Sequence, residues 1–171
     1  ALKDGEKDLL RFSPLLKDDD IESGFIRLFE SGPGDPPCPL IEGKCVKDSN
    51  RRAIFEDLIR FYNHFGLSYA EGAHEDRPDH IIYELEFMHY LCFLTLRAGQ
   101  QEKPAGDLLL AQRDFLEHHL AKWAGRLAGR LGEILAEAPE DQAGVFYNNL
   151  AALMARFIEG DHAYVNDRLT R

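Results

Sequence analysis

The sequence is poor in cysteine, in positive charge and in long apolar runs, and each shortage excludes a class of protein. Its 3 cysteines in 171 residues form no C-x-x-C pair, so neither a disulfide framework nor a zinc ribbon fits. The 20 Lys and Arg are outnumbered by 30 Asp and Glu, and the resulting net charge of −10 disfavours nucleic-acid binding. No stretch approaches the ~20 apolar residues that span a bilayer, so we expect no stable membrane insertion.

The sequence also lacks the short motifs of common catalytic and nucleotide-binding sites. There is no G-x-S-x-G, no G-x-x-x-x-G-K-[ST] and no G-x-G-x-x-G, so these two classes gain no support. The opening residues, ALKDGEKD, have no charged-then-apolar signal pattern, and we predict a cytoplasmic location. Cys92 lies in the apolar run LCFLTL, where we expect it to be buried as a small apolar side chain.

Helical periodicity dominates the sequence, and the alternation typical of strands is nearly absent. Ile21, Phe25 and Phe29 lie on one helical face, directly after three aspartates that suit a helix N-terminus. The run from Pro78 is apolar nearly all round, which predicts a central helix and the most buried element. We therefore predict one all-α globular domain over residues 1–171, with six or seven helices. Helices are expected from Asp18 to about Gly32, from Ser49 or Asn50 to Gly66, from Pro78 to about Gly99, from Pro104 with a break near His119 to Lys122, and after Pro139-Glu140-Asp141.

Two loops interrupt these predicted helices. Residues 32–48 are rich in proline and hold two of the cysteines, which predicts an irregular loop long enough to have a function. We expect this loop to lie beside the surface that binds a partner. The second loop, residues 68–77, is acidic because it contains Glu71, Glu75 and Asp76.

Glu-x-x-His, the spacing of ligand pairs in di-iron helix bundles, occurs three times. A di-iron centre needs such pairs on helices that face one core, but the first pair falls in the acidic loop and the third is expected near a helix end. Chance on solvated helix faces is the preferred interpretation, and a helical di-iron-type metalloprotein is the alternative. We interpret His118 and His119 as surface or hinge residues. The three pairs are Glu71 with His74, Glu86 with His89, and Glu159 with His162.

Arg77-Pro78-Asp79-His80, followed one turn later by Glu84, is an unusual cluster at the predicted start of the central helix. An acid there is favoured by the helix dipole and accepts hydrogen bonds from exposed backbone N–H groups, so capping is one interpretation. In the other interpretation, Asp79, Glu84 and the acidic loop form a negative rim around an apolar groove. Such a site would hold a peptide that is basic at one end and apolar at the other.

Four stretches, in the same order along the chain, resemble the TorD/DmsD/NarJ family of redox-enzyme maturation chaperones. The first is Arg27-Leu28-Phe29 with the Gly-Pro-Gly and Pro-Pro that follow, and the second is Phe61-Tyr62-x-x-Phe65-Gly66-Leu67. The third and most specific, Pro78-Asp79-His80-x-x-x-Glu84-Leu85-x-Phe87-Met88, is similar to the family's E-x-x-D-H and L-E-F-M signature. The fourth is Gln112-x-x-Phe115-Leu116-x-x-His119-Leu120-x-x-Trp123. The chain departs from the family at Cys38–Glu42, where it keeps an acid but lacks the usual tyrosine.

The resemblance implies an all-helical, TorD-like domain without enzymatic activity and without a cofactor of its own. Its partner would be the apo catalytic subunit of a DMSO-reductase-family molybdoenzyme, together with the twin-arginine signal peptide of that subunit. This client would carry the molybdopterin guanine dinucleotide cofactor, and the chaperone would delay its export until the cofactor is inserted. We expect a monomer or a dimer that binds no nucleic acid and no metal.

Matching the motifs residue by residue, the resemblance assigns Asp79 and His80 to the Asp-His pair implicated in client binding. No catalytic residue is predicted. Four further motif positions are expected to hold the fold: Glu84, Gln112, His119 and Trp123. The candidate set for client or signal-peptide binding is Asp79, His80, Glu84, Glu42, Tyr62 and His119.

Overall fold

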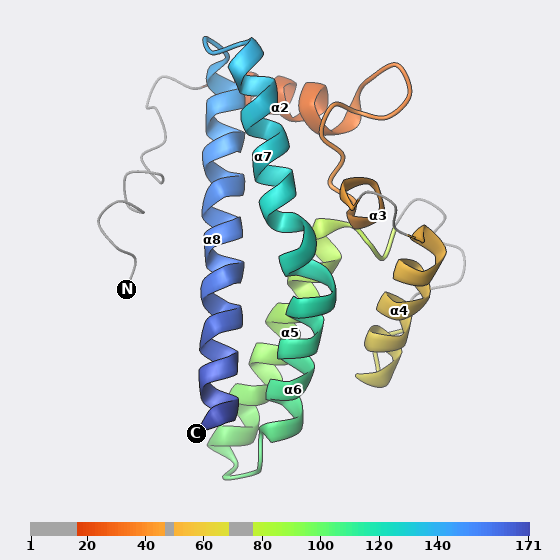
Figure 1. Cartoon of the computed structure of the whole chain (residues 1–171), viewed down its shortest axis with the longest axis vertical. Coiled ribbons are helices and arrows are strands. Elements are labelled where there is room, and N and C mark those ends of the chain that lie inside the picture. Colours follow the sequence, from red (N-terminus) through yellow and green to blue (C-terminus); the bar gives the residue numbers. More distant parts are fainter. Residues whose placement is uncertain (1–16, 47–49, 69–76) are drawn as a thin grey trace. The chain divides into compact units, whose positions relative to one another are not determined.

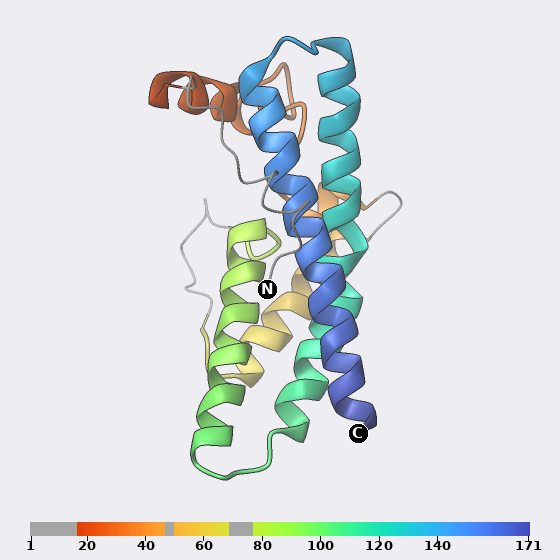
Figure 2. The same cartoon turned by 90° about the vertical axis from the view of Figure 1, so that its left-hand side faces the viewer.

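The computed structural model describes residues 17–46, 50–68 and 77–171. Within these ranges the regular elements are helices and no strand is present (Figure 1 and Figure 2). The predicted all-α fold is confirmed. None of the described helices combines the length and the apolar character that a membrane span requires.

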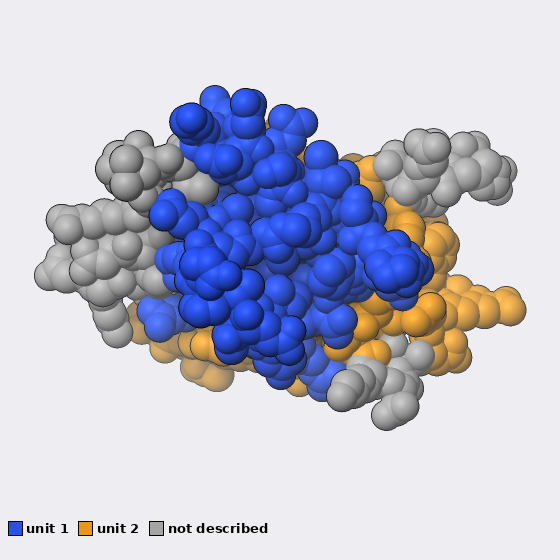
Figure 3. Space-filling view, turned by 90° about the horizontal axis from the view of Figure 1, so that it is seen from above, with its two compact units in different colours: residues 1–40, 124–157 blue, residues 41–123, 158–171 orange. Residues whose placement is uncertain are grey.

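The chain forms two compact units, which Figure 3 shows in different colours. Unit 1 comprises residues 1–40 and 124–157, and unit 2 comprises residues 41–123 and 158–171. The prediction of a single domain over residues 1–171 stays a prediction.

Unit 1 begins with helix α2, Asp18–Phe25, whose first turn holds three aspartates at the positive end of the helix dipole. The helix continues into a π-helical turn, η1, Ile26–Glu30, before the chain turns at Gly32 as predicted. Leu28, in η1, is 1% exposed, so this turn supplies part of the core of unit 1.

Two long helices contribute to unit 1: α7, Ala121–Glu137, and α8, Gln142–Thr170. On α8, Tyr147 meets the ring of Phe29 edge-on, with centroids 5.1 Å apart. The hydroxyl of Tyr147 donates to the backbone oxygen of Ile21 at 3.0 Å. The side chain of Tyr147 therefore links α8 to both α2 and η1.

The segment that follows η1 is more ordered in structure than its composition predicts. Cys38 is fully buried, and its backbone N–H donates to the oxygen of Leu28 at 2.9 Å. The expectation of an irregular loop over residues 32–48 is wrong in part, because one helical turn, α3, Glu42–Cys45, lies within it. Residues 47–49 lie outside the described residues.

The first long helix of unit 2, α4, Arg51–His64, begins and ends as the sequence predicts. The side chain of Asn50 caps it by accepting the backbone N–H of Ala53 at 3.3 Å. Gly66 follows the C-terminus with φ of +76°, a left-handed conformation that glycine adopts without strain.

Helix α5, Ile81–Gln100, begins later than predicted. Pro78 does not open it, and Asp79 is not in its first turn. His80 is the N-cap: its backbone is extended, and its Nδ1 accepts the N–H of Ile82 at 3.3 Å. Of the two interpretations of Asp79, the one in which it caps this helix is therefore wrong, since the neighbouring histidine is the cap.

Helix α5 is also less buried than predicted. Leu91 is 0% exposed, but Ile82, Phe93 and Leu96 are 53%, 46% and 61% exposed. Cys92, expected to be buried, is exposed on the same helix. The described residues cover one face of α5 and leave the other exposed. The apolar side chains on every face of this helix therefore did not predict burial of every face.

The break or kink predicted near His119 to Lys122 takes the form of a π-helical turn that begins three residues earlier, and the helix is not interrupted there. Helix α6, Gly106–Phe115, passes into a π-helical turn, η2, Leu116–Leu120, from which α7 continues. At this junction the ring of Phe115 packs against Phe87 and Phe61, with centroids 4.7 and 5.3 Å away. The extra residue of a π-helical turn shifts the side chains that follow, and such turns are frequent at functional sites.

We expect Leu91→Ala to lower the free energy of unfolding by about 2–5 kcal/mol, because truncating a buried leucine loses contacts and leaves a cavity. Leu96→Ala on the uncovered face is the matched control, with an expected change within about 0.5 kcal/mol. Urea unfolding followed by circular dichroism measures both changes. Equal losses in the two variants would mean that the core lies elsewhere.

Candidate functional site

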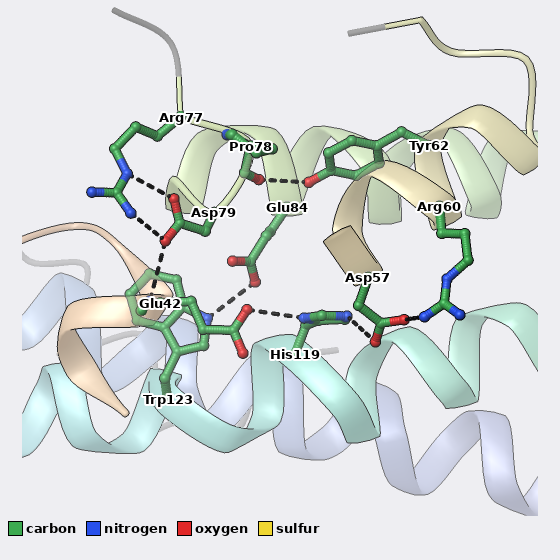
Figure 4. A network of polar contacts seen from close by, with 11 residues as sticks. Glu42, Asp57, Arg60, Tyr62, Arg77, Pro78, Asp79, Glu84, His119 and Trp123 are labelled. Atoms are coloured by element: carbon green, nitrogen blue, oxygen red, sulfur yellow. Dashed lines mark hydrogen bonds and ion pairs between the residues drawn. The ribbon is translucent and has the colours of Figure 1, made fainter. Parts of the chain in front are cut away.

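Unit 2 contains a network of buried polar side chains, drawn in Figure 4. Three carboxylates, Glu42, Asp79 and Glu84, are 1%, 1% and 0% exposed, and His119 is 2% exposed. Acidic side chains are almost never buried this completely unless partners compensate them. The identity and position of these partners make the network the candidate site.

Helix α3 is held to the start of α5 by backbone groups. The N–H of Glu42 donates to the backbone oxygen of Asp79 at 2.8 Å, and the N–H of Gly43 donates to Asp79 Oδ2 at 3.2 Å. An isolated bridge pairs Ile41 with His80 next to these bonds. A Cβ on Gly43 would lie 3.0 Å from Asp79 Oδ2, so glycine allows the close approach.

Asp79 is ion-paired with an arginine that precedes it by two residues in the sequence. Arg77 donates through Nε to Oδ1 and through Nη2 to Oδ2 of Asp79, both at 2.9 Å. Such a two-pronged guanidinium–carboxylate pair is strong and fixes the geometry of both groups. The Arg77 side chain is 36% exposed and that of Asp79 1%, so the arginine faces solvent and the aspartate does not.

Glu84 lies deeper in the network. Its Oε2 accepts the indole N–H of Trp123 at 3.0 Å, while its Oε1 has no hydrogen-bond partner among the described residues. Burial, followed by the negative charge of Glu42, raises the pKa of Glu84 well above its ordinary value, and the indole bond only partly opposes this. Burial therefore shifts the protonation balance of Glu84 toward the neutral acid.

Tyr62, on α4, is the next member of the network. It is 7% exposed, and its hydroxyl donates to the backbone oxygen of Pro78 at 2.8 Å. Burial raises the pKa of Tyr62, and the nearby carboxyl groups of Glu84, Glu42 and Asp79 raise it further. The side chain stays a phenol that donates a hydrogen bond.

His119, in η2, connects the interior to the surface. Its Nδ1 lies 2.9 Å from Glu42 Oε2, and its Nε2 lies 3.3 Å from Asp57 Oδ2 without the alignment of a hydrogen bond. The Asp57 side chain is 35% exposed and is ion-paired with Arg60 (Figure 4). The interpretation of His119 as a surface or hinge residue is wrong for its exposure, because the π-helical turn directs it inward.

Five of the six candidate residues for client binding thus meet in one buried network: Glu42, Tyr62, Asp79, Glu84 and His119. The sixth, His80, lies beside it as the N-cap of α5. The sequence analysis missed two members, Asp57 and Gly43. No local pattern marks Asp57, which follows the equally acidic Glu56 on a helix face.

The predicted negative rim is wrong for two of its members. Asp79 and Glu84 are buried and point toward partners inside unit 2, because those partners replace the water that a rim would supply. The remaining members, Glu71, Glu75 and Asp76, lie outside the described residues.

The arrangement of the described side chains does not support the metal-binding alternative. In residues 17–46, 50–68 and 77–171, no group of three or more His, Cys, Asp or Glu is placed to hold a metal ion. Glu86, His89 and Glu159 are exposed, and α8 runs past the third pair instead of ending near it. The first pair, Glu71 with His74, lies outside the described residues.

Residues 3–129 match the family described as the nitrate reductase delta subunit. The match includes every member of the buried network and covers well over half of the chain. The chain therefore belongs to the nitrate reductase delta subunit family, the family of NarJ and TorD. The resemblance carried by the four motif stretches is confirmed.

Curated relatives support the same assignment. The selenate reductase assembly chaperone protein of Thauera selenatis is 36% identical over 118 residues, which are 69% of this chain and 61% of the relative. The chlorate reductase assembly chaperone protein of Ideonella dechloratans is 36% identical over 121 residues, with the same two shares. The perchlorate reductase assembly chaperone protein of Dechloromonas aromatica is 34% identical over 141 residues, 82% and 59% of the two chains. The chain thus spans about three fifths of the length of these relatives, and no solved structure matched it at the same stringency.

The raised pKa of Glu84 predicts a pH-dependent stability. The folded chain keeps this proton at pH values where the unfolded chain has lost it, so stability falls as pH rises from about 4.3 toward the raised pKa. Glu84→Gln keeps an oxygen for Trp123 and cannot ionise. We expect this variant to gain stability relative to the wild type across that window.

Urea unfolding at a series of pH values, followed by the fluorescence of Trp123, measures this difference. The exposed Glu86→Gln, on the same helix, is the control and should follow the wild type. A difference between Glu84→Gln and the wild type that does not change with pH would contradict the prediction.

His119→Ala removes the partner of a buried carboxylate and leaves Glu42 uncompensated. We expect a loss of about 3–5 kcal/mol in the free energy of unfolding, the usual effect of breaking a buried pair from one side. The double variant Glu42→Gln/His119→Ala removes the charge as well and should recover part of this loss. Denaturant titration measures both, with the exposed His118→Ala as control; a double variant no better than His119→Ala would rule out the pairing.

Proposed function

We propose that the chain is an assembly chaperone for the catalytic subunit of a DMSO-reductase-family molybdoenzyme. One observation carries the proposal: relatives of 34–36% identity are named as assembly chaperones of oxyanion reductases, in line with the family match over residues 3–129. These relatives are named as chaperones and not as enzymes, which supports the prediction that this chain catalyses no reaction.

In the finer proposal, the chain binds the apo subunit in the cytoplasm, before export. It recognises the twin-arginine signal peptide of the subunit and releases the client after the molybdenum cofactor has been inserted there. The net charge of −10 favours encounter with a basic signal peptide. The cofactor belongs to the client, and the chaperone supplies only binding energy.

The buried network supports this function as a scaffold. It fixes α3, the start of α5 and η2 relative to one another within unit 2 through contacts of Glu42, Asp79 and His119. Direct contact of Asp79 and His80 with the client stays a prediction. To reach Asp79, which is 1% exposed, a client would have to displace Arg77.

Deleting the gene in its native organism tests the chaperone function. We expect the catalytic subunit of one molybdenum reductase to be synthesised but to contain little molybdenum and to lose activity. Metal analysis of the purified subunit measures the defect, and the gene supplied from a plasmid should correct it. A molybdoenzyme from outside the DMSO reductase family, in the same cell, is the control. Full metal content in every molybdoenzyme of the deletion strain would overturn the proposal.

A further inference from the structure

A groove lies in unit 2 along α4 and α6, with a volume of about 480 Å³. This is within the size range of sites that hold a small ligand or a few peptide side chains. One of its leucines, Leu110, is 38% exposed, so the apolar surface is open to solvent. The apolar lining of this α4–α6 groove is Phe61, Phe65, Leu108, Leu110 and Ala111.

The polar lining of the α4–α6 groove is mainly acidic. Asp57, Asp107 and Asp114 contribute three carboxylates, while Arg60 is the single Lys or Arg among the lining residues. Asp57 is ion-paired with Arg60, and Asp114 lies 2.6 Å from Arg113. Negative charge therefore exceeds positive charge beside an apolar floor, which complements a segment that is both basic and apolar.

A second hollow in unit 2 has a volume of about 370 Å³. The two hollows share Asp57 and Arg60. His119 lines the second hollow, and its Nε2 is buried without a hydrogen-bond partner among the described residues. The buried Nε2 of His119 therefore lies next to the carboxylate of Asp57, which lines both hollows. Asp57 belongs both to the α4–α6 groove and to the buried network.

From this geometry we propose that the α4–α6 groove binds the signal segment of the client, with Asp57 as the carboxylate that receives an arginine. The apolar side chains of the segment occupy the groove, and the incoming guanidinium replaces Arg60 on Asp57. The inference rests on the proposed function, because that function supplies a peptide with paired arginines and an apolar run. It assigns that peptide to a surface away from the Asp-His pair at the start of α5.

Accessibility favours Asp57 over Asp79 as the arginine acceptor. The Arg60 side chain is 77% exposed, and exposed pairs three residues apart on a helix contribute little, so displacing Arg60 is easy. Asp79, by contrast, is 1% exposed and holds both Arg77 and the N–H of Gly43. An incoming arginine reaches Asp57 without disturbing the packing of unit 2.

The first test titrates a synthetic peptide, two adjacent arginines followed by a leucine- and alanine-rich run, into the full chain by calorimetry. Asp57→Asn should weaken binding about tenfold, since it removes a charge-assisted bond. Glu56→Gln is the matched control: it changes a neighbouring carboxylate that is also ion-paired with an arginine, and affinity should be unchanged. A peptide with glutamines in place of the arginines should bind wild type and Asp57→Asn equally.

Two further variants separate a binding role from a structural one. Arg60→Gln removes the competitor for Asp57 and should tighten binding severalfold, whereas the exposed Arg52→Gln should leave affinity unchanged. Leu110→Arg places bulk and positive charge on the wall of the groove and should abolish binding. Leu96→Arg makes the same change at another exposed leucine, on α5, and should not affect binding.

The outcomes distinguish this inference from the proposed function. If Asp57→Asn and Leu110→Arg bind like the wild type while Asp79→Asn loses binding, the groove assignment is overturned and the chaperone function stands. If the wild type does not bind the peptide at all, the inference is also overturned, and the gene deletion alone then decides the proposed function. Weaker peptide binding by Asp57→Asn, tighter binding by Arg60→Gln and unchanged affinity in the controls would establish the α4–α6 groove as the binding site.

Discussion

The fold of unit 2 buries three carboxyl groups, and each of them must be compensated by a partner or by a proton. Moving an ion out of water costs several kcal/mol unless new partners replace the lost hydration. The chain uses a different solution for each group. Asp79 receives a guanidinium and a backbone N–H, Glu42 faces an imidazole, and Glu84 has a raised pKa that favours its neutral form. A neutral Glu84 removes one of three like charges, so the remaining two are easier to accommodate.

These interactions join segments that are distant in sequence. His119 and Glu42 are 77 residues apart, Trp123 and Glu84 are 39 apart, and Gly43 and Asp79 are 36 apart. No such pair can form until the helices that carry it have packed, so the network forms together with the fold of unit 2. The same contacts fix where α3 lies on α5, a placement that one helical turn in a proline-rich segment would not hold by itself.

The sequence predicts features that are decided within a few residues. Asn50 caps α4 and Gly66 follows its C-terminus, as the sequence predicts, because caps and stop signals act locally. Prediction failed where a distant partner decides the outcome. Asp79 has the residue type of a cap, but its partners include Gly43 from another segment. For the site, five of the six residues named from the sequence lie in the network, whereas Asp57 is indistinguishable from its neighbours until His119 is packed beside it.

The position of Asp57 connects the rigid interior with the open surface. Its carboxylate is 35% exposed on one side, and on the other its Oδ2 lies 3.3 Å from His119 Nε2, whose ring also contacts the Glu42 of α3. The guanidinium proposed to replace Arg60 on Asp57 carries the same charge as the one it displaces, so the carboxylate beside His119 stays compensated while the groove is occupied. The α4–α6 groove and the attachment of α3 therefore share three side chains, Asp57, His119 and Glu42, in which each contacts the next.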